Sequence, residues 1–145
     1  MALIDTGALV ALIDVRDGRN ARATRLLRDL PGYVRTTWAV ITETLHLLGT
    51  AAESRGTQPW HGQALLARRL QDGHGLVVAD FTAALGRRSL DLMREYADRP
   101  MDFADASLVA LAETTGDLRI ITFDADSRIY RTADGRALEI LNGSV

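Results

Sequence analysis

Short apolar runs alternate along the chain with longer segments in which apolar residues recur every three or four positions. The short runs predict β-strands, because they are rich in aliphatic residues and are bounded by polar or turn-forming ones. The longer segments predict helices with one apolar face. Strands are predicted at residues 2–5, 33–36, 76–79, 119–123 and 138–141, and helices at about 7–14, 19–30, 38–48, 59–72, 82–97 and 102–115.

Capping and turn residues set the expected ends of these elements. The Thr6 hydroxyl can cap the first helix, and Pro31-Gly32 stops the second. Gly49 is expected to end the third helix, which leaves residues 51–58 as a polar loop. Pro100 is expected to break the chain before the last helix.

The alternation of strands and helices is typical of an α/β fold, in which helices cover both faces of a mainly parallel sheet. A chain of 145 residues suits one domain, residues 1–145, with a sheet of about five strands. The order of the strands stays open. In such sheets the ligand site lies beyond the carboxyl ends of the strands, so residues that directly follow a strand are the first candidates for function.

The composition excludes several kinds of chemistry. The chain has no cysteine and no lysine, and all 17 of its basic residues are arginine. Disulfides, thiolate metal sites, cysteine nucleophiles, lysine Schiff bases and a lysine-bearing phosphate loop are therefore excluded. The net charge of −2 argues against a protein that binds nucleic acid through its overall charge alone.

The chain shows no feature of a membrane or exported protein. No apolar run reaches the roughly 18 residues of a membrane-spanning helix. The N-terminus has no basic stretch followed by an apolar segment. We therefore expect a cytoplasmic protein without a membrane partner.

Four acidic residues stand beside apolar segments that are far apart in the chain. Asp5 and Asp124 directly follow predicted strands, whereas Glu43 and Asp105 lie on predicted helices. A carboxylate next to buried apolar residues is costly unless its charge is compensated, and several carboxylates brought together by folding repel one another. A divalent cation is the usual compensation. These four residues are therefore candidate metal ligands.

Helix capping is a structural alternative for some of these acids. Asp102 and Asp105 have the spacing of a capping box. Asp102 is best explained as the N-cap itself, whereas Asp105 projects into an apolar arc and is favoured as a ligand. Asp5 can likewise cap the helix that follows it, although the apolar strand before it favours a ligand.

The remaining acids are weaker candidates. Glu43 lies just outside the apolar arc of its helix, a position that suits a cleft acid and a surface glutamate equally. Asp124 is favoured over Asp126 because it is nearer the strand end, although aspartate is also common in turns. The three histidines lack the spacing of a zinc-binding helix.

Two further groups of residues have ordinary structural explanations. Arg22, Arg25 and Arg28 share one helix face, which amphipathicity explains first and a patch for phosphate or an acidic partner second. Trp38 and Trp60 each lie at the start of a helix and are expected to pack against the core.

Taken in order, the segments around the acids resemble the PIN-domain nucleases, in particular the small VapC-like toxins of bacterial toxin–antitoxin pairs. The resemblance covers essentially the full length. No single segment is specific, but the ordered set is strong. The segments are Leu3-Ile4-Asp5-Thr6-Gly7-Ala8-Leu9, Thr42-Glu43-Thr44-Leu45, Met101-Asp102-Phe103-Ala104-Asp105-Ala106-Ser107-Leu108-Val109-Ala110 and Ile121-Thr122-Phe123-Asp124-Ala125-Asp126.

The resemblance implies a Rossmann-like α/β/α sandwich and an endoribonuclease that cleaves RNA with Mg²⁺ or Mn²⁺ and a metal-activated water. It also implies a toxin that pairs with a second copy of itself and is silenced by a small antitoxin. By position, the metal-binding acids are Asp5, Glu43, Asp105 and Asp124; Asp102 and Asp126 are additional acids beside them, and Thr6 and Thr122 match hydroxyl positions that line such sites.

Three other interpretations compete with a nuclease. A PIN-like binding or regulatory module with little or no hydrolysis is the main alternative, although such a site is expected to lose some of its acids. An aspartic protease is suggested by Asp5-Thr6-Gly7, but that enzyme is almost wholly β, and the helical periodicity contradicts it. A phosphorylated receiver domain requires a lysine that this chain lacks.

Overall fold

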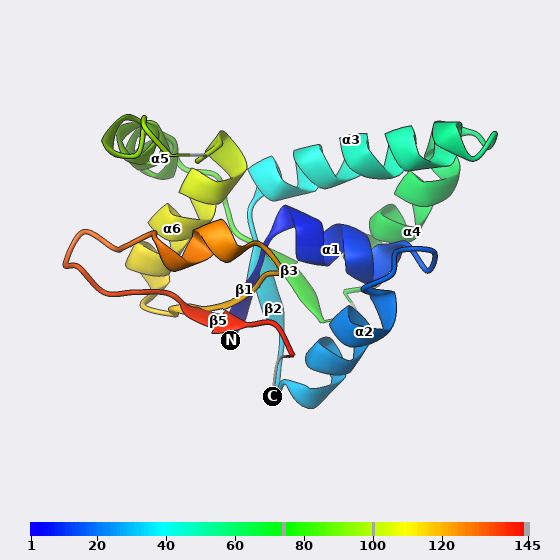
Figure 1. The fold of residues 1–145 in the computed structure, drawn as a ribbon, viewed down its shortest axis with the longest axis horizontal. Coiled ribbons are helices and arrows are strands. Elements are labelled where there is room, and N and C mark those ends of the chain that lie inside the picture. Colours follow the sequence, from blue (N-terminus) through cyan, green and yellow to red (C-terminus); the bar gives the residue numbers. More distant parts are fainter. Residues whose placement is uncertain (74, 100, 144–145) are drawn as a thin grey trace.

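A parallel sheet forms the middle of the molecule (Figure 1). The computed structural model describes residues 1–73, 75–99 and 101–143. The five strands lie in the order β3-β2-β1-β4-β5, and each neighbouring pair is parallel. The predicted α/β fold is confirmed. The strands are β1 (Ala2–Ile4), β2 (Val34–Thr36), β3 (Leu76–Val78), β4 (Arg119–Ile121) and β5 (Glu139–Leu141).

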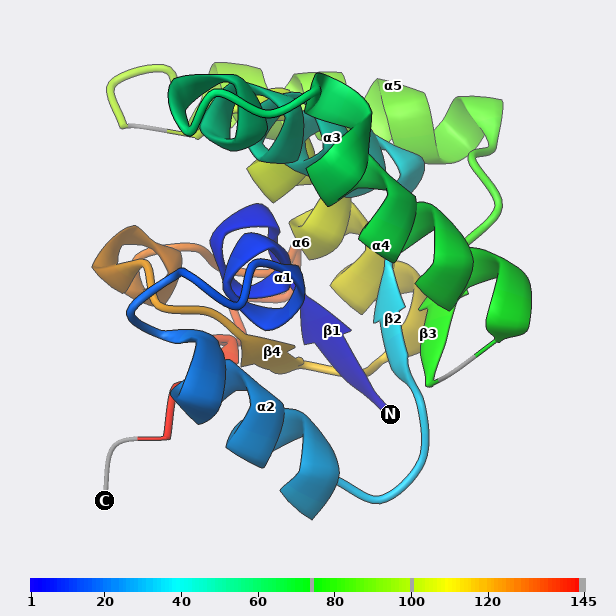
Figure 2. The same cartoon turned by 90° about the vertical axis from the view of Figure 1, so that its right-hand side faces the viewer.

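Helices connect the strands and flank the sheet. In the view of Figure 2, α3 and α5 lie above the strands and α2 lies below them. A short 3₁₀ helix, η1 (Ala125–Arg128), follows β4 and was not predicted. The α-helices are α1 (Thr6–Ile13), α2 (Asn20–Asp29), α3 (Trp38–Ser54), α4 (Pro59–Asp72), α5 (Ala83–Glu95) and α6 (Phe103–Thr115).

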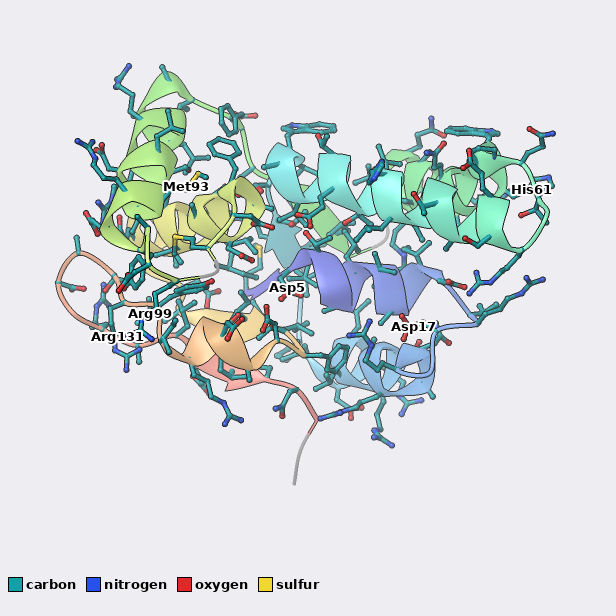
Figure 3. The ribbon with its side chains drawn as sticks, turned by 45° about the horizontal axis from the view of Figure 1, so that its top comes forward. Asp5, Asp17, His61, Met93, Arg99 and Arg131 are labelled. Atoms are coloured by element: carbon teal, nitrogen blue, oxygen red, sulfur yellow. The ribbon has the colours of Figure 1, made fainter. Side chains whose placement is uncertain are left out.

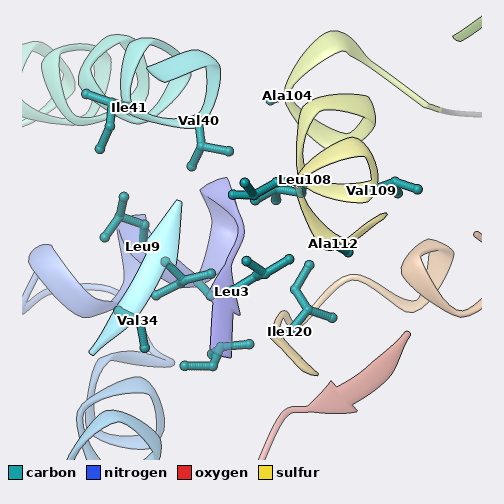
Figure 4. Close-up of a cluster of buried hydrophobic side chains, with 14 of the residues drawn as sticks. Leu3, Leu9, Val34, Val40, Ile41, Ala104, Leu108, Val109, Ala112 and Ile120 are labelled. Carbon is teal, nitrogen blue, oxygen red and sulfur yellow. The ribbon is translucent and has the colours of Figure 1, made fainter. Parts of the chain in front are cut away.

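The core lies between the sheet and the helices that cover it (Figure 4). Leu3 of β1 and Ile120 of β4 meet Leu9 of α1, Ile41 of α3 and Leu108 of α6 there, and all five are at most 2% exposed. The α6 helix is buried over most of its length, as its nearly continuous apolar sequence predicted. This packing fixes the helix ends relative to the strand ends.

The strand order brings two chain segments together at the carboxyl edge of the sheet. In the register of β1 with β4, Leu3 is opposite Ile120 and Ile4 is opposite Ile121. The next residues, Asp5 and Thr122, therefore leave neighbouring strands side by side. The sequence had left this adjacency open, and it decides where the polar side chains meet.

Two predicted helix ends are wrong. Helix α3 does not end at Gly49 but continues to Ser54, so residues 51–54 of the predicted loop are helical. The helix runs through Gly49 without a break and packs against α4, where a Cβ on Gly49 would lie 2.8 Å from the side-chain nitrogen of Gln63. At the first helix, Asp5 and not Thr6 is the N-cap, because the Asp5 carboxylate accepts the Ala8 N–H.

The packing predicted for the tryptophans is also wrong, since Trp38 is 51% exposed and Trp60 is 60% exposed. The predicted break at Pro100 lies outside the described residues, as does His74. The parallel sheet excludes an all-β aspartic protease. None of the helices in the described ranges has the length and apolar character needed to cross a bilayer.

Candidate active site

The six acidic residues singled out in the sequence line one hollow at the carboxyl edge of the sheet. This hollow has a volume of about 360 Å³ and is called the acid pocket below. Figure 3 shows Asp5 in the middle of the molecule, at the head of α1. The residues lining the acid pocket are Asp5, Thr6, Gly7, Arg19, Glu43, Leu47, Asp102, Asp105, Phe123, Asp124 and Asp126.

Asp5 is the most deeply placed of these acids, with 6% of its surface exposed. Its Oδ1 accepts the Ala8 backbone N–H at 2.9 Å, and its Oδ2 accepts the Thr122 hydroxyl. The capping alternative for Asp5 is therefore confirmed, but the same carboxylate also lines the acid pocket. Two hydrogen bonds and the end of β1 hold it in one orientation.

Thr122 joins the ends of the two neighbouring strands. Its buried hydroxyl donates to Asp5 and accepts the Asp124 backbone N–H at 3.0 Å. The Asp124 carboxylate in turn accepts the Asp126 N–H at 2.9 Å and caps η1. Asp124 therefore stabilises the turn after β4 and also lines the acid pocket.

Glu43 enters the acid pocket from the first half of α3. Its Oε2 accepts the Thr6 hydroxyl at 3.3 Å. The side chain is partly buried, unlike an ordinary surface glutamate. Helix periodicity alone did not distinguish a cleft acid from a surface glutamate at this position. The contact with Thr6 of α1 places the Glu43 carboxylate at the pocket.

Asp102 and Asp105 form the capping box that their spacing predicted. Asp102 Oδ1 accepts the Asp105 N–H at 2.8 Å, and Asp105 Oδ2 accepts the Asp102 N–H at 3.2 Å. Asp102 is confirmed as the N-cap of α6. Asp105 caps and also lines the acid pocket, so the capping and pocket positions do not exclude each other.

Burial and mutual repulsion favour the protonated forms of three pocket acids. Burial, followed by the charge of Asp102, raises the pKa of Asp105 to about 8. The same two causes raise the pKa of Glu43 above its usual range. Burial is also the main cause that raises the pKa of Asp5, against the lowering effect of its bond with Thr122. Without a cation, the pocket therefore disfavours the ionised form of all three carboxyl groups at the same time.

Sequence reasoning missed three residues at this site. Arg19 and Phe123 line the acid pocket. Tyr130, with 2% of its surface exposed, lines a separate small cavity together with Asp5 and Asp105, and burial and the charge of Asp105 raise its pKa. No local pattern marks these residues, because Arg19 begins an exposed helix and the aromatic rings resemble core residues.

A wider groove of about 600 Å³ adjoins the acid pocket and shares Glu43 and Asp102 with it. The exposed side chains of Trp38 and Phe81 line this groove. The groove is larger than the acid pocket, but its remaining lining is largely apolar. The oxygen atoms that a hard cation requires are therefore concentrated in the acid pocket.

The oxygen atoms that could bind a cation come from the acids of the pocket. Within the described residues, no group of three or more His, Cys, Asp or Glu side chains is already arranged to hold a metal ion. The acids surround a space of about 360 Å³, which is wide enough for water molecules as well as an ion. Such an arrangement suits an ion that keeps part of its hydration shell.

Comparisons with known proteins agree with this geometry. The chain is similar to VapC20 of Mycobacterium tuberculosis, a sarcin-ricin loop cleaving toxin, with a TM-score of 0.73 and 26% identity over 87% of this chain and 92% of that one. No curated protein sequence matches the chain.

Two other solved structures share the fold. One is a toxin–antitoxin complex from Klebsiella pneumoniae, with a TM-score of 0.60 and 21% identity over 86% of this chain and 87% of that one. The other is FitAcB from Neisseria gonorrhoeae, with a TM-score of 0.57 and 18% identity over 99% of this chain and 98% of that one.

The family model of the PIN domain matches residues 2–135, which include all the acids of the pocket. The resemblance inferred from the ordered acidic segments is thereby confirmed, and the chain belongs to the PIN domain family.

Proposed function

We propose that this protein is a metal-dependent endoribonuclease that cleaves RNA phosphodiester bonds, and that it is the toxin of a toxin–antitoxin pair. The observation that carries this proposal is that all six predicted acids line one pocket of a PIN fold. The similarity to a toxin that cleaves the sarcin-ricin loop supports a ribonuclease.

The acid pocket fits a hard divalent cation such as Mg²⁺ or Mn²⁺. Its donors are carboxylate oxygens, which these ions prefer, and the raised pKa values of Asp5, Glu43 and Asp105 are consistent with acids that ionise more readily when a cation is bound beside them. Asp5, Glu43, Asp105 and Asp124 would hold the ion, with Asp102 and Asp126 as further acids. A bound ion supplies an activated water and stabilises charge on the phosphate.

The residues around the pocket orient the acids for this role. Thr122 and the Ala8 N–H fix the Asp5 carboxylate, and Thr6 holds the Glu43 carboxylate. Because these donors are already in place, little reorganisation is needed when a cation and a phosphate enter.

The proposal extends to partners and location. The similarity to VapC20 and the fold shared with a toxin–antitoxin complex support a small antitoxin as partner. We further propose a homodimer, as the family resemblance implies. An RNA substrate would place the activity in the cytoplasm.

Incubation of the purified protein with total RNA tests the proposed activity. We expect cleavage with Mg²⁺ or Mn²⁺ and none with excess EDTA. The Asp5→Asn variant, which keeps the size of the side chain but removes its charge, should cleave at least about 100-fold more slowly. Asp98→Asn is a matched control, because Asp98 is exposed and lies outside the acid pocket.

Cleavage that persists in EDTA, or equal rates for wild type and Asp5→Asn, would refute the nuclease proposal. Metal-dependent stabilisation without any cleavage would favour the alternative of a binding or regulatory module. Induction in cells tests the toxin role, since an Asp5→Asn variant as toxic as the wild type would separate toxicity from the acid pocket.

A further inference from the structure

Arg19 carries the positive charge among the described residues that line the acid pocket. It lies just before α2, whereas most of the pocket belongs to the strand ends, α3 and α6. A cation so close to a metal site repels the metal, so its presence among the acids requires another explanation.

Two neighbours hold the Arg19 guanidinium in place. Asp17 accepts Arg19 Nε and Nη2 at 3.1 Å each, and it also accepts the Arg19 backbone N–H at 2.8 Å. The guanidinium carbon lies 5.3 Å from the centre of the Phe123 ring. Figure 3 shows Asp17 in the segment that links α1 to α2. This arrangement fixes both the position and the plane of the guanidinium.

The third nitrogen of Arg19 remains available. A Cβ on Gly7 would lie 3.9 Å from Arg19 Nη1, so this nitrogen lies over the first turn of α1. Nη1 has no hydrogen-bond partner among the described residues. Its N–H groups are therefore free to donate to an anion at the edge of the acid pocket.

We infer that Arg19, held by Asp17 and Phe123, forms a phosphate-binding subsite that takes a backbone phosphate of the RNA beside the phosphate being cleaved. The inference rests on the proposed function and adds a residue that positions the substrate. A fixed guanidinium with free N–H groups matches the oxygens of a phosphate. Because the side chain is already ordered, its binding costs less conformational entropy than that of a mobile arginine.

A role as internal counter-ion explains the arrangement less well. Asp17 already neutralises Arg19 through two hydrogen bonds, so the pair as a whole offsets little of the charge of the pocket acids. What the pair supplies is a set of oriented donors. A substrate that brings its own negative charge can use them once a metal ion has neutralised the acids.

The test compares Arg19→Gln with Arg25→Gln, which makes the same charge change at an exposed arginine of α2 outside the pocket. Affinity for a labelled random-sequence single-stranded RNA is measured with Ca²⁺ at several salt concentrations, and cleavage is measured with Mg²⁺. We expect Arg19→Gln to weaken binding on the order of 10- to 100-fold, as for loss of a charged hydrogen bond. Its effect should fall mainly on KM.

The salt dependence provides a second readout. Loss of one phosphate contact should reduce the slope of log affinity against log salt by about 0.7. Arg19→Lys should recover part of the affinity and the full slope, because it keeps the positive charge but loses the planar set of N–H donors of the guanidinium. If Arg19→Gln fails to fold, Arg19→Lys provides the test by itself, because it should weaken binding while it leaves the slope unchanged.

The outcomes separate the subsite from the proposed function. If wild type binds and cleaves RNA while Arg19→Gln matches Arg25→Gln in affinity and slope, the subsite is refuted and the nuclease stands. If wild type neither binds nor cleaves RNA, both fail. A loss confined to Arg19→Gln, with stabilisation by Mn²⁺ retained, supports the subsite.

Discussion

The Asp5 carboxylate depends on a single buried hydroxyl for one of its two hydrogen bonds. Thr122 supplies that hydroxyl and also accepts the Asp124 N–H at 3.0 Å, so one side chain orients two residues that line the acid pocket. Its own surface is fully buried. The hydroxyl therefore matters for stability and for the geometry of the pocket at the same time.

Replacement of Thr122 tests this dependence. Thr122→Val keeps the shape but leaves Asp5 and the Asp124 N–H without their partner, and we expect a loss of about 1–3 kcal/mol in the free energy of unfolding. Thr122→Ser keeps the hydroxyl and should lose much less. Urea denaturation of both variants measures the difference, and equal losses would show that only packing is involved.

The raised pKa of Asp105 predicts how stability depends on pH in the absence of metal. The folded protein holds this proton up to about pH 8, whereas the unfolded chain releases it near the ordinary value of 3.8. The folded state therefore binds more protons between these values, and the free energy of unfolding falls as pH rises through this window.

Thermal unfolding in EDTA from pH 5 to pH 8 measures this dependence. Asp105→Asn cannot titrate and keeps an oxygen for the capping bond, so its melting temperature should fall less than that of wild type across the range, whereas Asp98→Asn should follow wild type. A wild-type melting temperature that rises with pH would contradict the predicted sign.

Among the elements, the pair α3 and α4 shows how glycine controls close packing. The backbone of α3 passes unbroken through Gly49, and Gly62 of α4 faces Leu48. A Cβ on Gly62 would lie 3.0 Å from the Leu48 carbonyl oxygen, whereas a Cβ on Gly49 would first meet the flexible end of Gln63 at 2.8 Å. The Leu48 carbonyl oxygen belongs to the backbone of α3 and cannot move aside as easily as the end of the Gln63 side chain.

The two glycines should therefore respond differently to alanine. Gly62→Ala gains helix propensity of about 1 kcal/mol, but forcing the helices apart should outweigh this and give a net loss of about 1–2 kcal/mol. Gly49→Ala should be close to neutral. Chemical denaturation compares the variants, and a stabilised Gly62→Ala would show that the helices can separate without cost.

The same pair shows why some element boundaries were predictable and others were not. The starts of α4 at Pro59 and α6 at Asp102–Phe103 follow local rules, and both were found. Gly49 looks like a helix end by the same rules, yet α3 continues through it to Ser54 while it packs against α4. The error came from a tertiary contact that local pattern does not contain.

For the molecule as a whole, the negative charge gathered in the acid pocket predicts strong linkage between metal binding and stability. An ion that binds only the folded state at 100 times its dissociation constant adds about 2.7 kcal/mol to the free energy of unfolding. We expect Mn²⁺ to raise the melting temperature of wild type by several degrees.

Asp5→Asn should lose most of this gain, because it removes the charge of the most buried acid, whereas Asp98→Asn should retain it. Differential scanning calorimetry with a Mn²⁺ titration measures the shift. Equal shifts in wild type and Asp5→Asn would place the ion elsewhere, and the proposed role of the acid pocket would fail.

Local sequence was sufficient for the kinds of element, the position of the acids at strand ends and helix starts, and the ordered pattern that identifies the family. These follow from side-chain periodicity and capping, which act over a few residues. The neighbourhood of Asp5 and Thr122, the contact of Glu43 with Thr6, and Arg19 above Gly7 arose only from the fold. They depend on strand order and helix packing between distant segments, and no short stretch of the chain encodes such pairings.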